Sequence, residues 1–393
     1  MDFKFTEEQQ MLRDSIQKFV REHYPADRVG ARRKAFRKAP GFAEENWQQF
    51  ADLGWLGVPF PEELGGIGGD LADVMVVMEE LGKGLVVEPY FPTVVLFGSA
   101  LMLGGNADQQ QSLVPQLIEG KLRGTLAYME EQARYELADV ATTATARDGK
   151  YLLNGTKSLV LNADSADYLV VSARTGGDRT AREGITLFLV PADAEGVKRV
   201  DYPTIDVLRA SEVSFENVAV GEDAILGSVG EGLALLEAIS QRAILALGAE
   251  SVGMMEMLYR DTTDYTSQRV QFEKPLAAFQ SVKHRIVDMF VQTELTRSLL
   301  YRATMEVQGE HEDAPLDVHG LKHMVGKAGR FVGQSAVQLH GGMGQTEELR
   351  VGHYFIRLAA IDAQFGDTDY HLGRYTELMP IPEGEPDADL LPF

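Results

Sequence analysis

Residues 336–346 read AVQLHGGMGQT, and they place three glycines directly after a stretch that otherwise has the composition of a helix. Glycine in a helix interior costs about 1 kcal/mol relative to alanine, so such a cluster needs a structural reason. A helix end is one reason, because glycine supplies the left-handed cap. The other is a flat or phosphorylated ligand lying against bare main chain, which a side chain would hold away. The rest of the chain bears on this choice.

The chain is strongly acidic. Its 393 residues carry 59 acidic and 37 basic side chains, a formal net charge of −22, and no cysteine. Such a surface repels nucleic acid and anionic lipid, and the lack of cysteine excludes disulfides, thiolate metal sites and cysteine nucleophiles. The longest apolar run, 94–105, is shorter than the about 20 residues of a membrane span, and the start lacks a signal-peptide core. We therefore expect a soluble, cytoplasmic protein with no membrane span and no nucleic-acid partner.

The residue pattern changes twice along the chain, which gives three successive regions. Apolar residues recur at helical spacing up to about residue 121, for example over 71–85. Short alternating segments rich in β-branched residues, separated by turn signals, then indicate antiparallel strands to about residue 225. Long stretches with few helix breakers begin at Gly230 and must pack together as a bundle, and the tail 380–393 is expected to be a loose end. The strand and helix patterns do not alternate along the chain, so we do not expect a Rossmann nucleotide site.

Four stretches resemble the acyl-CoA dehydrogenase family and keep its order along nearly the whole chain: DLGWLGVPFPEELGGIGGDLADVMVVMEELGKGL (52–85), RDGKYLLNGTKSLVLNADSADYLVVSAR (147–174), YTSQRVQFEKPLAAFQSVKHRIVDM (265–289) and AVQLHGGMGQTEELRVGHYFIRL (336–358). The resemblance implies an α+β multidomain fold with an N-terminal helical domain (1–121), a middle antiparallel β-barrel domain (122–228) and a C-terminal four-helix bundle (229–393). It also implies FAD, an acyl-CoA substrate in fatty-acid metabolism, an electron-transfer flavoprotein as electron acceptor, and a tetramer built as a dimer of dimers.

The bundle carries the residues that the resemblance assigns to FAD. In the family pattern Y-x-x-x-R-x-x-F-x-x-P-L the arginine meets the FAD pyrophosphate, and that position is Arg269 here. An acidic protein needs such a local cation to hold a diphosphate. Phe272 would lie against the cofactor and Gln280 would bond its adenosine end. The alternative is that Arg269 is a solvated helix arginine and Phe272 an ordinary core residue.

The glycine cluster takes its meaning from the same resemblance. In the family, a QxxGG segment of one subunit approaches the adenine side of the FAD held by its neighbour, and here Gln338, Gly341 and Gly342 occupy those positions. A side chain at either glycine would hold the cofactor away. His340, directly before the glycines, is expected to be structural.

The position of the catalytic base is unusual. The family reaction removes an α-proton from an acyl-CoA thioester while a β-hydride goes to flavin N5, so it needs a carboxylate at the α-carbon. Most members carry this glutamate in an E-G-T motif, but here Gly366-Asp367-Thr368 puts glycine in its place. Thr368 is taken as a further cofactor contact. The minority position, on the first long bundle helix, holds Ala243. Asp367 as the base, Glu250 as the base, and no base in this chain all stay open.

The flavin cradle also departs from the family pattern. The T-E-P-x-x-G-S-D loop becomes MEEQARYELADV (129–140), with Met129 for the threonine and Glu131 for the proline. The W-I-T segment that stacks on the flavin reads LVL, with Leu159 for tryptophan and Leu161 for threonine. Leucine cannot donate a hydrogen bond to flavin N5.

The residues assigned to FAD in the bundle are kept, whereas the base and flavin-cradle positions depart from the family pattern. This difference suggests an assembly of unlike subunits. The chain resembles the small subunits of mixed α2β2 bacterial members, such as pimeloyl-CoA dehydrogenase-like enzymes and those with steroid-type substrates, in which one subunit completes the FAD site of the other. The leading hypothesis is an FAD-dependent acyl-CoA dehydrogenase acting as a subunit of a homo- or heterotetramer. The alternatives are a catalytically silent architectural subunit and a relative with different acyl-CoA chemistry, such as elimination. Neither the length nor the branching of the acyl chain follows from the sequence.

Overall fold

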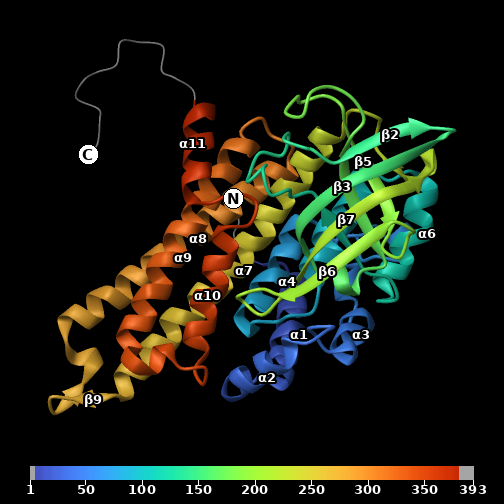
Figure 1. The fold of residues 1–393 in the computed structure, drawn as a ribbon. Helices are drawn as coiled ribbons and strands as arrows, with labels where there is room; N and C mark the ends of the chain where they lie inside the picture. Colours follow the sequence, from blue (N-terminus) through green and yellow to red (C-terminus); the bar gives the residue numbers. More distant parts are fainter. Residues whose placement is uncertain (1–4, 380–393) are drawn as a thin grey trace, which may run out of the picture.

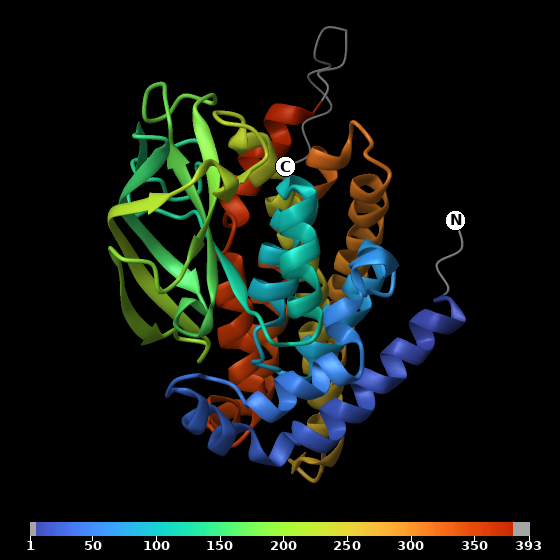
Figure 2. The same ribbon diagram turned by 90° about the vertical axis from the view of Figure 1, so that its right-hand side faces the viewer.

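The computed structural model describes residues 5–379, so the predicted loose end at 380–393 lies outside the described residues. A β domain packs against one side of an elongated helical body (Figures 1 and 2). Helices from both ends of the sequence share that body, and the largest core cluster runs through both sets of helices. The order helical, β, helical confirms the predicted fold class.

The N-terminal helices begin at side chains that cap them. Thr6, Asp70 and Asn106 each accept a backbone N–H from the first turn of the following helix, which satisfies donors that the helix itself leaves free. The elements are α1 (Glu7–His23), α2 (Val29–Phe36), α3 (Glu44–Asp52), α4 (Leu71–Gly84), a π-helical segment (Phe91–Phe97), α5 (Gly98–Gly104) and α6 (Ala107–Ile118). The apolar run at 94–105 therefore forms buried helix in the core.

Helix α4 packs directly against α7 (Gly232–Gln268), the first helix of the C-terminal bundle. Glycine permits this close approach from both sides. A Cβ on Gly82 would come within 2.4 Å of the Glu250 carbonyl oxygen, and one on Gly253 within 2.1 Å of the Glu79 carbonyl oxygen. The N-terminal and C-terminal helices are thus in close backbone contact. The domain boundaries at residues 121 and 228 stay a prediction.

The β domain is a mixed sheet in the order β6-β7-β3-β2-β4-β5-β8, and β1 pairs with β4 at the side of this path. Most neighbours are antiparallel, as predicted, but β1 runs parallel to β4 and a single β2–β4 pair is also parallel. A separate core fills the sheet's inner face. The strands are β1 (Gly124–Ala127), β2 (Thr143–Arg147), β3 (Lys150–Leu161), β4 (Tyr168–Arg174), β5 (Ile185–Pro191), β6 (Val197–Pro203), β7 (Arg209–Val220) and β8 (Ile225–Leu226).

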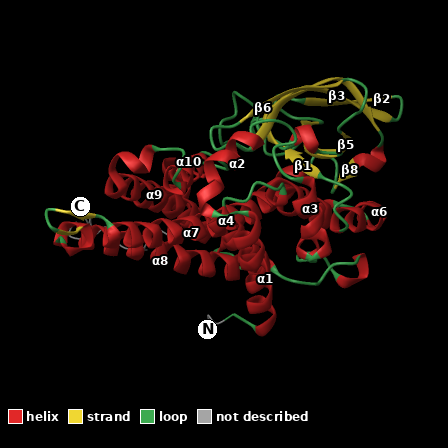
Figure 3. Ribbon diagram, turned by 90° about the horizontal axis from the view of Figure 1, so that it is seen from below, coloured by secondary structure: helices red, strands yellow, loops and turns green. Residues whose placement is uncertain are grey.

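The C-terminal bundle consists of α7, α8 (Gln280–Gln308), α9 (Ala314–His340) and α10 (Arg350–Asp362), with α11 (Thr368–Leu378) packed on α9. A small hairpin, β9 (Val270–Gln271) and β10 (Lys274–Pro275), joins α7 to α8 at the end of the molecule opposite α11 (Figure 1). Helix α7 is long and apolar enough to cross a membrane by length and composition, but 67% of its apolar window is buried inside the protein. Its apolar character is therefore that of a core helix. Figure 3 shows the β domain lying beside the helical body.

Candidate active site

The hairpin between α7 and α8 presents the predicted FAD residues to solvent. Arg269, Phe272 and Gln280 are all exposed, Phe272 to 84%. Phe272 is therefore not an ordinary core residue of this chain. No hydrogen bond or ion pair of the Arg269 side chain is recorded within residues 5–379. Phe272 and Glu273 both have positive φ, 54° and 64°, at the tip of the hairpin. Non-glycine residues are strained there, and such strain is common where backbone shape serves a function.

The glycine segment lies beside this hairpin. Helix α9 ends at His340, and Gly341 follows with φ of +60°, a conformation that favours glycine. A Cβ at Gly341 or Gly342 would meet nothing within 4 Å, and Gln338 is exposed. The glycines therefore end the helix and leave an open stretch of main chain, and a ligand lying against it stays a prediction.

His340 connects the two segments and is structural, as expected. Its ring is buried, stacks on Tyr265 with centroids 4.4 Å apart, and lies with Nδ1 2.8 Å from the Ala336 carbonyl oxygen. Tyr265 precedes Arg269 by one helical turn and donates to the His340 carbonyl oxygen at 3.4 Å. The structure therefore brings the arginine, the hairpin and the glycines to one exposed surface.

Asp367 and Thr368 lie away from that surface, where α11 begins, and Figure 1 shows α11 at the end of the helical body opposite the hairpin. Asp367 is the helix cap: its Oδ1 accepts the backbone N–H groups of Asp369 at 3.1 Å and Tyr370 at 2.8 Å. Thr368 Oγ1 donates to Asp362 Oδ1 at 2.7 Å. The roles of Asp367 as base and Thr368 as cofactor contact stay predictions, and the structure adds capping and loop contacts to both side chains.

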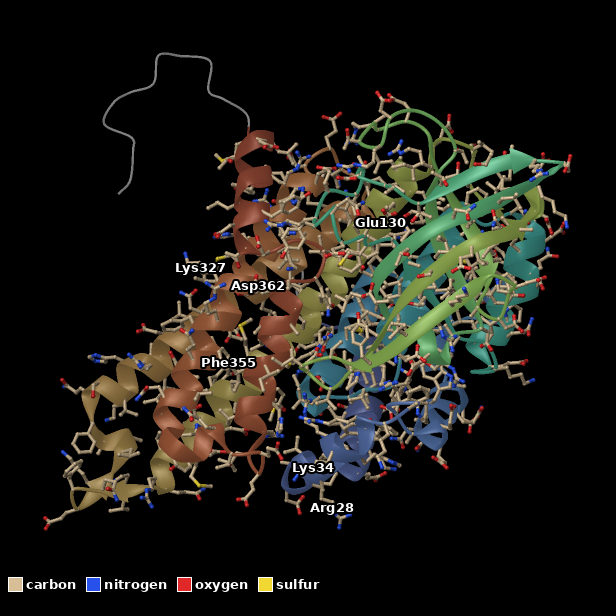
Figure 4. All side chains as sticks on the ribbon, in the orientation of Figure 1. Arg28, Lys34, Glu130, Lys327, Phe355 and Asp362 are labelled. Atoms are coloured by element: carbon tan, nitrogen blue, oxygen red, sulfur yellow. The ribbon has the colours of Figure 1, made fainter. Side chains whose placement is uncertain are left out.

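A buried lysine fixes the loop that takes the place of E-G-T. Lys322 is fully buried on α9 and donates to the carbonyl oxygens of Asp362 at 2.9 Å and Gly366 at 2.6 Å. Burial lowers the pKa of Lys322 to about 8. His371 Nε2 lies 2.8 Å from the Phe365 carbonyl oxygen and holds the other side of the loop. Figure 4 shows Asp362 beside α9, close to Lys327. The loop is therefore anchored through its main chain.

Three aromatic rings meet where this loop faces the β domain. Phe365 stacks on Tyr128 with ring centroids 5.0 Å apart, and Phe91 contacts Phe365 edge to face at 6.3 Å. Phe91 and Phe365 are buried, and burial raises the pKa of Tyr128. These rings come from the π-helical segment, β1's end and the α10–α11 loop, and together they fill the space between the helical body and the sheet. No sequence motif indicates this cluster, because its members are distant in the chain.

The positions that face the flavin in the family carry hydrocarbon here. Leu159 has φ of +50° and lies in an irregularity of the β3–β7 pairing between Lys157 and Val160. Leu161 lines a cavity of about 40 Å³, together with Glu250 and Arg357. Ligand pockets usually measure about 300–1,000 Å³. The cavity beside Leu161 is therefore too small for an isoalloxazine ring, whereas the exposed glycine main chain leaves room for the adenine end of FAD.

Glu250 is fully engaged. Arg357 donates Nε and Nη2 to its two carboxylate oxygens, each at 2.7 Å, and Nη1 to Asp206 Oδ2 at 2.7 Å. Burial disfavours the charged guanidinium, but Glu250 and Asp206 outweigh it and raise the pKa of Arg357. A general base needs a free lone pair directed at substrate. The geometry gives Glu250 the role of a structural counter-ion, and Ala243, at the other base position, is buried in α7.

A second buried ion pair supports the loop 129–140. Lys157 on β3 donates to Glu130 Oε1 at 2.6 Å and to Ser172 Oγ at 2.9 Å. Glu130 also accepts the backbone N–H groups of Ala141 at 2.8 Å and Thr142 at 3.1 Å. Burial opposes ionisation of Glu130, but Lys157 prevails and lowers its pKa to about 2. The loop that lost the family's flavin-binding residues thus keeps a defined anchor in the sheet (Figure 4).

The chain matches family models along most of its length. Residues 6–121, 125–218 and 230–377 match the N-terminal, middle and C-terminal domains of acyl-CoA dehydrogenase. A short-chain-specific acyl-CoA dehydrogenase from Megasphaera elsdenii is 30% identical over 323 residues, which cover 80% of this chain and 84% of that protein.

Solved structures agree with these matches. The butyryl-CoA dehydrogenase of Megasphaera elsdenii superposes with a TM-score of 0.89 at 27% identity, covering 96% of this chain and 99% of that one. A chain of the ChsE4-ChsE5 complex from Mycobacterium tuberculosis superposes with a TM-score of 0.86 at 26% identity, covering 97% and 100%. Three family domains in the family's order, on the same fold, show that this chain belongs to the acyl-CoA dehydrogenase family of flavin-dependent oxidoreductases.

Proposed function

We propose that the chain takes part in FAD-dependent desaturation of an acyl-CoA thioester as one subunit of a heteromeric enzyme. In this proposal it donates Arg269, Gln338 and the open glycines to an FAD held by a paralogous partner, and the partner supplies the base and the flavin cradle. One observation carries the proposal: the FAD-contacting surface is exposed and uncommitted, while the base and flavin positions are closed by the protein's own side chains.

The exposed surface supports a shared cofactor. Arg269 is exposed and makes no side-chain hydrogen bond or ion pair within residues 5–379, so its guanidinium is free to make charge-assisted bonds to a diphosphate. It lies next to main chain at Gly341 and Gly342 that has room for a flat ring. FAD, when bound, accepts the hydride from the substrate's β-carbon. This chain's own residues would hold the pyrophosphate and the adenine, and so fix the position of the cofactor.

The occupied base and flavin positions of this chain support a partner subunit that supplies its own base. Phe91, Tyr128 and Phe365 occupy the space in front of the loop, and Glu250 is bound to Arg357. A heteromer also agrees with the likeness to a chain of a two-component complex. We expect a heterotetramer that works in the cytoplasm and passes its electrons to an electron-transfer flavoprotein.

A homotetramer in which Asp367 acts as the base is the second candidate. It is favoured by one feature: the helix cap uses only Asp367 Oδ1, and the other contact of this carboxylate is a side-chain hydrogen bond with Tyr135. The two candidates differ in what the chain does alone. A self-sufficient enzyme binds FAD and loses dehydrogenation on Asp367→Asn, whereas a completing subunit shows no activity alone and is unaffected by that change in the heteromer.

The flavin itself provides the test. The chain is co-expressed with a paralogue encoded in the same host, and bound flavin is measured by its visible spectrum in wild type, Arg269→Gln and the surface control Arg147→Gln. A charge-assisted hydrogen bond contributes about 1.5–3 kcal/mol, so Arg269→Gln should weaken FAD roughly 10- to 150-fold without changing thermal stability. Equal flavin retention in wild type and Arg269→Gln would refute the proposed contact, and no flavin in any combination would refute the function.

A further inference from the structure

A cleft on the helical body has the opposite charge from the rest of the molecule. It opens between α1, α4, α7 and the start of α10, which lie side by side in the view of Figure 3, and its volume is about 420 Å³. Five cationic side chains and two carboxylates line it, in a chain with 37 basic and 59 acidic residues. The cations are Arg13, Arg21, Lys83, Arg260 and Arg350.

The two lining carboxylates lie at the bottom and are already neutralised. Glu80 is contacted by Arg13 and Lys83, both at 2.8 Å. Glu256 is contacted by Arg260 at 2.7 Å and by Lys83 at 3.2 Å. The Glu80 and Glu256 side chains are only 3% and 6% exposed, whereas Arg260 is 60% exposed. The open face of the cleft is therefore formed by cations, with the carboxylates behind them.

These contacts hold the guanidinium groups in place. Arg350 donates two hydrogen bonds to Asp261, from Nε to Oδ2 and from Nη2 to Oδ1, each at 2.6 Å. Arg21 has no recorded hydrogen bond or ion pair among residues 5–379, so its charge is not compensated. Including Glu79, Asp261, Glu294 and Arg297 from the layer behind, six cations still face five carboxylates. A preorganised cationic cleft loses little entropy when it binds an anion.

The remaining wall of the cleft is largely apolar, with Gln17 as its polar member. Val20, Tyr24 and Met257 lie along it, with the Tyr24 ring beneath the guanidinium of Arg32 at 4.2 Å. Arginine forks match phosphate oxygens, and an apolar or aromatic wall suits the organic part of a ligand. We propose that this cleft binds a phosphorylated small molecule with an organic moiety, of the class of a nucleoside diphosphate. The ligand is separate from the FAD contact at Arg269 and does not depend on the proposed function.

Calorimetric titration of the full chain, with its partner where one is needed, tests the proposal with ADP, inorganic pyrophosphate and CoA as probes. The double variant Arg21→Gln/Arg260→Gln removes the two exposed cations, and Glu256 keeps its contacts with Lys83 and Arg297. The matched control Arg147→Gln/Arg182→Gln removes two exposed arginines that have surface carboxylate partners elsewhere. Wild type and control should bind ADP saturably, and the double variant at least tenfold more weakly.

ADP should also bind several-fold more tightly than pyrophosphate, because only ADP contacts the apolar wall, and raising the salt concentration should weaken both. Binding of CoA with the same loss in the double variant would assign the site to the nucleotide part of CoA, and binding of ADP without CoA would assign it to a free nucleotide. No saturable binding of ADP, equal binding of ADP and pyrophosphate, or a loss of ADP binding in Arg269→Gln but not in the double variant would each overturn the proposal.

Discussion

Replacing Arg357 by methionine should destabilise the protein by about 3–5 kcal/mol near neutral pH, because it leaves two buried carboxylates without their cation. Arg357 comes from α10, Glu250 from α7, and Asp206 from the connection between β6 and β7. Glu250 is 9% exposed and Asp206 2% exposed, so water cannot take over the role of the guanidinium. Methionine keeps most of the side-chain volume, so the loss reports mainly the charge.

The same change should reverse the pH dependence of stability. In the wild type, burial opposes ionisation of Asp206, but Arg357 outweighs it and lowers the pKa below the ordinary value of 3.8. That contribution is present above the ordinary pKa and is lost as the pH falls below it. Without Arg357, only Thr204 and Arg33 still oppose the effect of burial, so the pKa of Asp206 should rise. The variant then binds a proton when folded, so its deficit should be smaller at about pH 5 than at about pH 8.

Guanidinium chloride unfolding, followed by tryptophan fluorescence at the two pH values, measures both effects. Arg330→Met is the control: this arginine is 63% exposed and contacts Asp362 at 3.2 Å, so its removal should cost less than about 1 kcal/mol at either pH. A deficit in Arg357→Met as small as the control's, or one that is equal at both pH values, would show that the carboxylates are not buried charges balanced by this arginine.

Two further changes test other parts of the structure. Gly253→Ala should lower the free energy of unfolding by about 1–3 kcal/mol in thermal unfolding, since its Cβ would meet the Glu79 main chain. The control Gly373→Ala, whose Cβ would meet nothing within 4 Å, should be neutral or stabilising by up to about 1 kcal/mol. Equal effects of the two changes would mean that α4 and α7 are not in contact there. Lys157→Met should cost about 3–5 kcal/mol. Because the pKa of Glu130 is lowered to about 2, the wild-type pair stabilises fully above the ordinary value of 4.5 and loses this contribution as the pH falls toward 2. An unchanged acid-unfolding curve in Lys157→Met would contradict this assignment.

The fold class follows from local signals. Helical spacing before residue 121 and after Gly230, with alternation between them, depends on neighbours a few residues apart, so the sequence alone predicts helical, β and helical parts. Pairing direction is not local. β1 lies parallel to β4 and a single β2–β4 pair is also parallel, while most other strand pairs are antiparallel, as expected; alternation along one strand does not report the direction of its neighbour.

The residues that the family resemblance assigns to FAD could be located from the sequence because they form short motifs, and their contact with FAD stays a prediction. The sequence placed Arg269, Phe272, Gln338, Gly341 and Gly342 on such segments, and the structure finds them exposed. The stack of Tyr265 on His340 that joins the two segments depends on a contact between residues 75 positions apart, which no motif reports.

What only the tertiary structure decided is the state of the base and flavin positions. The sequence showed that glutamate is missing from the E-G-T position and left Asp367, Glu250 or no base as alternatives. Folding then brings Glu250 to Arg357 across 107 positions and Phe91 to Phe365, and these contacts decide which carboxylate is engaged and which space is filled. Residue types and local spacing are written in the chain, but burial, charge compensation and cavity volume arise only when distant segments pack together.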